Sequence, residues 1–370
     1  MAQANVNFRL EKGDLDRLLN ALKLQGYKVV APVETDGAVM WGQIESASDL
    51  PWGKRDSQKP GHYRLEEGDA NRCFDIVNGP DSLKSLTFAA REKQTTIRQD
   101  GDASTLTFFP HKPEAEQIAL LGARACDIAA LGIQTKVLEE GEYSDPFFSA
   151  RKAGLLIVAV HCTRAAETCF CASMDCGPKA QAGFDIALTE LDDLFLIESG
   201  SEKGEAIVAL LALAEAGSEL TDRADDRIRA CADSQSREIN QQGLPQALYT
   251  AHDHPHWDEV AERCLSCSNC TMVCPTCFCH TVEEVPSMDR SESERFRVWD
   301  SCFSPEHGYI HGKNMRPTTR ERYRMWMTHK LGGWIDQFGT SGCTGCGRCS
   351  TWCPAGIDFV EEYKKVREEP

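Results

Sequence analysis

Cysteine is the residue type in this sequence whose spacing points most directly to chemistry. The chain of 370 residues contains 18 cysteines, and two groups of four repeat the pattern C-x2-C-x2-C-x3-C followed by proline. The first group is Cys264, Cys267, Cys270 and Cys274, and the second is Cys343, Cys346, Cys349 and Cys353. This spacing is typical of bacterial ferredoxins with two [4Fe–4S] clusters, in which the fourth cysteine of each group ligates the other cluster.

The spacing therefore predicts crossed ligand sets. One cluster is expected to take Cys264, Cys267, Cys270 and Cys353, and the other Cys343, Cys346, Cys349 and Cys274. Zinc is the alternative, because zinc ribbons also use C-x2-C pairs. A zinc ribbon, however, needs neither a third cysteine two residues further on nor the Cys-Pro step, so the pattern favours iron–sulfur clusters.

Four further cysteines suggest another site. Cys126 and Cys162 each follow a segment that is predicted to be a parallel strand, and Cys169 and Cys171 come soon after in HCTRAAETCFCASMDC. Because the carboxyl ends of parallel strands meet at one edge of a sheet, these four are predicted to converge on a candidate third [4Fe–4S] cluster. Cys176 could replace one of them. Buried thiols that pack as small hydrophobes are the open alternative.

The remaining cysteines have less certain roles. Cys277 and Cys279 follow the first group in PTCFCH, and Cys302 lies in WDSCF. They are expected either to pack beside the clusters and tune them, or to hold a metal together with His280. We interpret Cys73 and Cys231 as isolated core cysteines.

The elements that would position these cysteines form two regions. Residues 1–245 are predicted to be α/β, because apolar runs at 117–121 and 154–160 flank a helical pattern at 128–138, which is a parallel strand–helix–strand unit. Other expected elements are a helix at 14–25, strands at 27–33 and 38–44, a loop at 51–62, strand-like runs in 63–110, a hairpin at 184–189 and 194–198, and a helix at 202–213.

Residues 246–370 are predicted to form an α-helical ferredoxin domain with both clusters. Part of the polar stretch 215–256 is interpreted as the connector to it. The link between the cysteine groups, 275–342, is longer than in compact two-cluster ferredoxins. It has a helical pattern from residue 317 onward that ends at Gly339, so helices are expected to flank the clusters.

Composition limits the function classes. The net charge of −17 argues against a nucleic-acid partner, which needs a basic surface. No apolar run is long enough to span a membrane, and no secretory signal pattern opens the sequence, so a cytoplasmic location is expected. Neither G-x-G-x-x-G nor a P-loop is present. No catalytic residue is predicted, and catalysis and nicotinamide binding are expected on other subunits.

Several longer segments carry a family resemblance. They are GYKVVAPVETDGAVMW, DLPWGKRDSQKPGHYRL, GARACDIAALGIQ, HCTRAAETCFCASM, CLSCSNCTMVCPTCFCHTVE and GCGRCSTWCPAGID. Through them the sequence resembles the beta subunits of sulfhydrogenases, which are NADP-linked nickel–iron hydrogenases. A more distant similarity is to the electron-transfer component of anaerobic sulfite reductase. Cys176 and Ala125 depart from the family pattern, where a small or polar residue and proline are expected.

The resemblance implies an electron relay. Such a subunit would carry electrons between a flavin subunit that handles NAD(P)H and the small subunit of a cytoplasmic nickel–iron hydrogenase, which pairs with a large subunit. It also implies that the eight grouped cysteines are ligands, and the family's other cysteine motifs match at Cys126, Cys162, Cys169 and Cys171. The alternative is an electron-transfer subunit of an anaerobic sulfite or sulfur reductase. Polysulfide reduction at Cys126 and Cys162, or a non-redox scaffold, are further interpretations that the residues leave open.

Overall fold

An eight-stranded mixed sheet forms the centre of the N-terminal region in the computed structural model, which describes residues 7–100 and 105–368. The strand order is β12-β1-β11-β10-β9-β8-β2-β3. The bounds are β1 Phe8–Glu11, β2 Lys28–Thr35, β3 Ala38–Gln43, β8 Ile118–Ala123, β9 Leu155–Val160, β10 Ile186–Glu190, β11 Leu194–Ser199 and β12 Ala214–Glu215. Strands β10, β9, β8 and β2 are parallel, and the strands outside them pair antiparallel.

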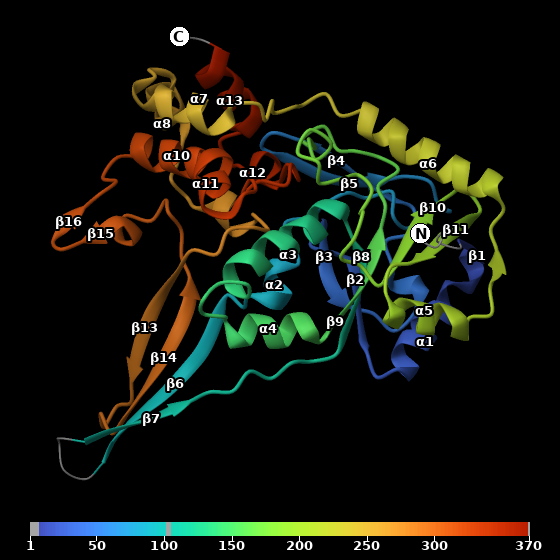
Figure 1. The fold of residues 1–370 in the computed structure, drawn as a ribbon, viewed down its shortest axis with the longest axis horizontal. Helices are drawn as coiled ribbons and strands as arrows, with labels where there is room; N and C mark the ends of the chain where they lie inside the picture. The colour runs from blue at the N-terminus through green and yellow to red at the C-terminus, as the bar shows by residue number, and fades with distance from the viewer. Residues whose placement is uncertain (1–6, 101–104, 369–370) are drawn as a thin grey trace.

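Helices cover both faces of this sheet (Figure 1). Their bounds are α1 Leu15–Leu24 and α5 Glu202–Leu210 on one face, and α3 Ala125–Leu138 and α4 Pro146–Ala153 on the other. Along β9, Leu156 and Val158 pack in the core with α1 and α5, whereas Leu155 and Ile157 pack in the core with α3 and α4. A parallel strand that is buried on both faces is apolar throughout, which explains the uninterrupted run LLIVAV.

Most expected elements of the α/β region are confirmed. The helix at 14–25, the strands at 27–33 and 38–44, and the helix at 202–213 correspond to α1, β2, β3 and α5. The parallel unit is β8–α3–β9, and the hairpin is β10–β11. Apolar residues at helical spacing predicted α1, and uninterrupted apolar runs predicted β8 and β9.

One expectation about a connecting segment was wrong. The supposed loop at 51–62 contains a hairpin of β4 Lys54–Lys59 and β5 His62–Glu67. Its buried Asp56 accepts a hydrogen bond from the backbone N–H of Val77, at 2.6 Å, so a tertiary contact stabilises a strand of low intrinsic propensity. The polar stretch 215–256 contains α6 Ser218–Asp233 and α7 Leu244–Thr250.

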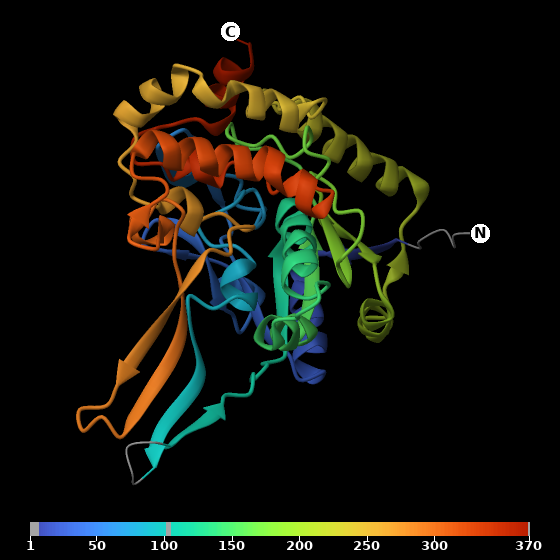
Figure 2. The ribbon, with the colours of Figure 1, turned by 60° about the vertical axis from the view of Figure 1, so that its left-hand side comes forward.

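A second sheet projects from the body as a long arm in both views (Figures 1 and 2). Its order is β13-β14-β6-β7, with bounds β6 Arg91–Asp100, β7 Thr105–Pro110, β13 His280–Pro286 and β14 Glu292–Trp299. Strand β14 pairs antiparallel with β6. The arm thus joins a segment of the N-terminal half to the link between the two cysteine groups. The division of the chain near residue 245 stays a prediction.

The C-terminal part combines helices with these strands, so the expectation of a purely helical ferredoxin is not confirmed. The helices are α8 His256–Arg263, α9 Asn269–Met272, α10 Thr319–Thr328, a π-helical turn His329–Gly333, α11 Trp334–Phe338, α12 Arg348–Thr351 and α13 Phe359–Glu368. Two short strands, β15 Tyr309–Ile310 and β16 Lys313–Asn314, form a separate hairpin. The predicted helical stretch is α10 to α11, and it ends at Gly339 with φ 67°. Within the described ranges, we find no helix with the length and apolar character needed to cross a membrane.

Candidate metal centres

The two cysteine loops share one backbone conformation. In the first loop, Ser266 and Ser268 have φ values of 49° and 67°, and at the same positions in the second loop, Gly345 and Gly347 have φ values of 68° and 74°. Residues in the left-handed backbone conformation turn the chain sharply, and serine rarely adopts this conformation. Both loops therefore wrap around a point, and α9 and α12 begin directly after them.

Each wrapped loop directs a backbone N–H group at a sulfur. The Ser266 N–H donates to Cys264 Sγ at 3.5 Å, and the Gly345 N–H donates to Cys343 Sγ at the same distance. Hydrogen bonds of this kind favour the thiolate over the thiol and tune the potential of an iron–sulfur centre.

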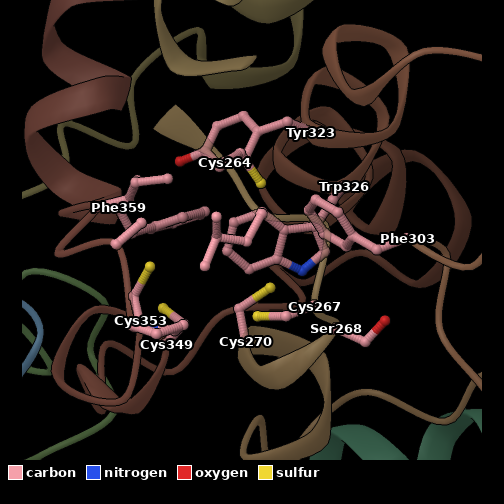
Figure 3. Close-up of a pocket in the computed structure, with 14 residues that line it drawn as sticks. Cys264, Cys267, Ser268, Cys270, Phe303, Tyr323, Trp326, Cys349, Cys353 and Phe359 are labelled. Atoms are coloured by element: carbon pink, nitrogen blue, oxygen red, sulfur yellow. The ribbon is translucent and has the colours of Figure 1, made fainter. Parts of the chain in front are cut away.

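The cysteines line two neighbouring cavities. The first, which is partly open to solvent, is lined by Cys264, Cys267, Cys270, Cys349 and Cys353 (Figure 3). The second is lined by Cys274, Cys343, Cys346 and Cys349. The fourth cysteine of each loop thus lies at the cavity of the other loop, and Cys349 borders both cavities.

The cavity walls carry polar atoms without partners. Tyr323 and Trp326 line the first cavity, and Thr344 lines the second. Tyr323 Oη, Trp326 Nε1 and Thr344 Oγ1 are buried and make no hydrogen bond within residues 7–100 and 105–368. Because buried polar groups are nearly always satisfied, these atoms indicate an occupant with acceptor atoms, as the sulfides of an iron–sulfur cluster would be.

Charge at the second cavity also fits such an occupant. The Lys330 side chain, carried by the π-helical turn, is buried and donates to Thr276 Oγ1. Burial lowers the pKa of Lys330, but the neighbouring thiolates of Cys274 and Cys277 outweigh burial and raise it. A buried cation compensates the negative charge of thiolates, which must be deprotonated to bind iron.

The donor sets suit a cluster better than a single ion. All 18 cysteines are free thiols. Within the described part of the chain, no three His, Cys, Asp or Glu side chains converge on a point that could hold one metal ion. The eight loop cysteines instead surround cavities, which is the arrangement that a cubane of several atoms requires.

Two of the four cysteines of the candidate third site lie at the carboxyl ends of neighbouring parallel strands. Cys126 is at the start of α3, directly after β8, and Cys162 follows β9. Asn78 Nδ2 donates to Cys126 Sγ at 3.3 Å, and Gln235 Nε2 donates to Cys171 Sγ at 3.4 Å. Burial, and then the charge of Cys162, raise the pKa of Cys169 to about 12.

Cys231 also belongs to this neighbourhood, so its interpretation as an isolated core cysteine was wrong. It lies on α6, and burial followed by the charges of Cys162 and Cys171 raises its pKa. No sequence signal pointed to it, because α6 is a polar helix about 60 residues beyond Cys171. Cys176 donates to the carbonyl of Met174 at 3.1 Å, and burial raises its pKa to about 11.

The third site packs directly against the second cysteine loop. The Phe170 N–H donates to the Gly345 carbonyl at 2.9 Å. A Cβ atom on Gly345 would come within 2.6 Å of the Cys171 Cα. Arg348 of the same loop is buried and forms an ion pair with Asp127, the residue after Cys126, at 2.8 Å.

The cysteines beyond the first loop form two contacts. Cys277 hydrogen-bonds with Cys274, at the second cavity. Cys279 hydrogen-bonds with Cys302 and with His307. The sequence analysis named His280 as a possible metal ligand beside these cysteines. In the structure, however, the His280 ring hydrogen-bonds to the backbone carbonyl of Phe278 at 3.1 Å. The histidine at this site is therefore His307.

Two paired loops, crossed fourth cysteines and buried compensating charge define an iron–sulfur protein of the electron-transfer class. In agreement, residues 263–357 match a family model described as a 4Fe-4S dicluster domain. The chain is 35% identical over 260 residues to sulfhydrogenase 2 subunit beta of Pyrococcus furiosus, covering 68% of this chain and 75% of that protein. It belongs to the sulfhydrogenase beta-subunit family. No solved structure matches it.

The close approach of the second loop to the third site yields a prediction about stability. The variant Gly345→Ala should lower the free energy of unfolding by about 1–3 kcal/mol more than Gly339→Ala, because its methyl group meets backbone atoms of Cys171. Gly339 is the matched control, since its φ of 67° is nearly the same and nothing lies near its Cβ position. Urea unfolding of the full chain under anaerobic conditions measures the difference, and equal losses would contradict the close approach.

Proposed function

We propose that this chain relays electrons between a flavin subunit that binds NAD(P)H and the small subunit of a cytoplasmic nickel–iron hydrogenase, whose large subunit completes the complex. The observation that carries the proposal is the pair of neighbouring cysteine-lined cavities with Cys349 on their common border. Bound [4Fe–4S] clusters accept and release single electrons. The name of the related Pyrococcus furiosus protein, a sulfhydrogenase beta subunit, supports the hydrogenase partner.

The proposal includes the crossed ligand sets. Cys264, Cys267, Cys270 and Cys353 would hold the cluster of the first cavity, and Cys343, Cys346, Cys349 and Cys274 that of the second. The position of Cys353 among the residues of the first cavity, and of Cys274 among those of the second, supports this assignment. Lys330 and the two loop N–H groups would stabilise the thiolates.

The first cavity is the proposed contact point for a redox partner. Cys267 is exposed, and the neighbouring Leu265 has 66% of its surface exposed. The aromatic rings of Trp326 and Phe359 also line this cavity and make part of its wall apolar (Figure 3). An electron entering here would have only a short path to the second cavity, because Cys349 borders both.

A third [4Fe–4S] cluster is part of the proposal. Cys162, Cys169 and Cys171 are three of its ligands, and the fourth is Cys126, as the sequence predicts, or Cys231, which neighbours Cys162 and Cys171. The N–H donors to Cys126 and Cys171 support a thiolate site. Its place against the second loop would extend the relay inward from the surface.

Iron analysis tests the third cluster. The anaerobically purified chain should contain about twelve irons rather than about eight, given four per cluster. Cys171→Ser should remove about four. The variants Cys126→Ser and Cys231→Ser then identify the fourth ligand, because only one of them should lower the iron content. If Cys171→Ser leaves the iron content unchanged, the third cluster is refuted.

The crossed assignment predicts which cluster each fourth cysteine serves. Cys353→Ser should alter the electron paramagnetic resonance signal that Cys267→Ser also alters, and Cys274→Ser should alter the signal that Cys346→Ser alters. Substituting a ligand of one cluster perturbs the spectrum of that cluster, because ligation sets its electronic structure. Pairing of Cys353 with Cys346 instead would show that each loop keeps all four of its own cysteines.

Native purification tests the physiological role. An affinity-tagged chain, isolated anaerobically from its own host, should bring down a flavoprotein together with the small and large subunits of a nickel–iron hydrogenase in fixed proportion. A chain with Leu265→Glu at the exposed rim of the first cavity should recover less of one of these partners, because burying a charge in an interface is costly. Recovery of a sirohaem protein in their place would favour a sulfite reductase and refute the hydrogenase assignment.

A further inference from the structure

The base of the projecting arm brings a pair of cysteines together. The register of β13 and β14 pairs His280 with Trp299, and the Asp300 N–H continues the ladder by donating to the Cys279 carbonyl at 2.9 Å. Cys279 thus lies just before one strand, and Cys302 lies just after the other. Their side chains pack in the same core, and each shifts the pKa of the other.

The two thiols differ in accessibility. Cys302 is buried, with 5% of its surface exposed in the core of the C-terminal part, and Cys279 packs against the same core but is only partly buried. His307 lies on the open side, with 24% of its side chain exposed. Its Nδ1 is 3.1 Å from an oxygen of Asp300, and the ring also bonds Cys279. A solvent molecule can therefore reach Cys279 but not Cys302.

The surroundings give the pair one negative charge. Hydrogen bonding from Cys302, and further from His307, lowers the pKa of Cys279 to about 4 even though burial opposes this shift. The same hydrogen bond raises the pKa of Cys302. The bond to Cys279 raises the pKa of His307. These shifts favour a thiolate at Cys279, a thiol at Cys302 and a protonated imidazole at His307.

None of the three proposed clusters uses these groups. A low-pKa, accessible thiolate next to a second, resolving thiol is the arrangement of cysteines that react with peroxides. We propose that Cys279 and Cys302 form a redox-active dithiol that reduces hydroperoxides, with Cys279 as the attacking sulfur, Cys302 as the resolving thiol and His307 as the proton donor.

The reaction balances with the groups at the site. The Cys279 thiolate attacks the terminal oxygen of the hydroperoxide, the O–O bond breaks, and the leaving alkoxide takes the proton of His307 to give an alcohol. Cys279 is then a sulfenic acid. The Cys302 thiol attacks its sulfur, the S–O bond breaks, and water leaves as the disulfide forms. The dithiol has lost two electrons, and the O–O bond has gained them.

The disulfide should be easy to reduce again. Because the Cys279 thiolate is stabilised in the reduced form, the couple is expected to be oxidising compared with an ordinary structural disulfide. Two electrons and two protons from a low-potential donor restore the dithiol. Reduced iron–sulfur centres are such donors, and on this point alone the inference rests on the proposed function. The charge of Cys270, which lines the first cavity, contributes to the raised pKa of Cys302. The Cys279–Cys302 pair therefore lies near the first cavity.

Peptide mass spectrometry with differential alkylation tests the thiol chemistry without reference to the clusters. One equivalent of hydrogen peroxide, added anaerobically to the full chain, should convert Cys279 and Cys302 into a disulfide. Cys302→Ser should instead accumulate a sulfenic acid at Cys279 that dimedone labels. Cys279→Ser should leave Cys302 unmodified, because the second thiol is buried. His307→Gln should slow the reaction at least about tenfold, since a positioned general acid is lost.

Cys73→Ala is the matched control, because Cys73 is another buried thiol that lies outside both the proposed cluster sites and this pair. It should behave like the unmodified chain. The inference is overturned if peroxide leaves both sulfurs unmodified, or if the sulfenic acid of Cys302→Ser forms elsewhere. It is also overturned if Cys279→Ser or Cys302→Ser lowers the iron content by about four, which would make the pair cluster ligands. Loss of all iron with intact disulfide chemistry would refute the proposed function but not this inference.

Discussion

A buried ion pair between Arg348 and Asp127 is the contact on which the arrangement of the cysteine sites depends. Arg348 is 2% exposed, and it donates to the carbonyls of Gly79 and Asp81 as well as to the Asp127 carboxylate. A buried pair stabilises little compared with apolar packing, but removing one partner leaves a costly uncompensated charge. Because Arg348 lies within the second cysteine loop and Asp127 follows Cys126, the pair fixes the loop against the α/β sheet.

This attachment puts the cysteine sites in a spatial order. The first cavity reaches the surface at Cys267, the second shares Cys349 with it, and the Cys169–Cys171 segment packs against the second loop. The left-handed Gly345 allows the two backbones to touch, since a side chain there would collide with Cys171. A relay needs its centres close together and held rigidly, and contacts between backbones meet that need better than contacts between flexible side chains.

The arm adds a second connection between the two halves of the chain. Strand β14, from the link between the cysteine loops, pairs with β6, which lies in the chain between the parallel strands β2 and β8. Lys84 stabilises the base of the arm through two contacts. Its ammonium group lies 4.0 Å from the centroid of the Trp299 ring, and it donates a hydrogen bond to the Met272 carbonyl beside the first loop. The Cys279–Cys302 pair therefore sits where the arm, the first loop and the C-terminal core meet.

Features that depend on near neighbours in the chain could be predicted from local sequence patterns. Three cysteines two residues apart can wrap only one centre, so the spacing was enough to predict that each loop forms a site, and the apolar run of β9 was enough to predict a buried parallel strand. Which distant residues lie next to the cysteine sites depends on packing between separate elements of the fold. Cys231, His307 and Lys330 come from separate helices and turns, and the β4–β5 hairpin depends on the contact of Asp56 with Val77. No local sequence pattern predicts these contacts, because they form between residues that are distant in the chain and become neighbours only when the fold packs.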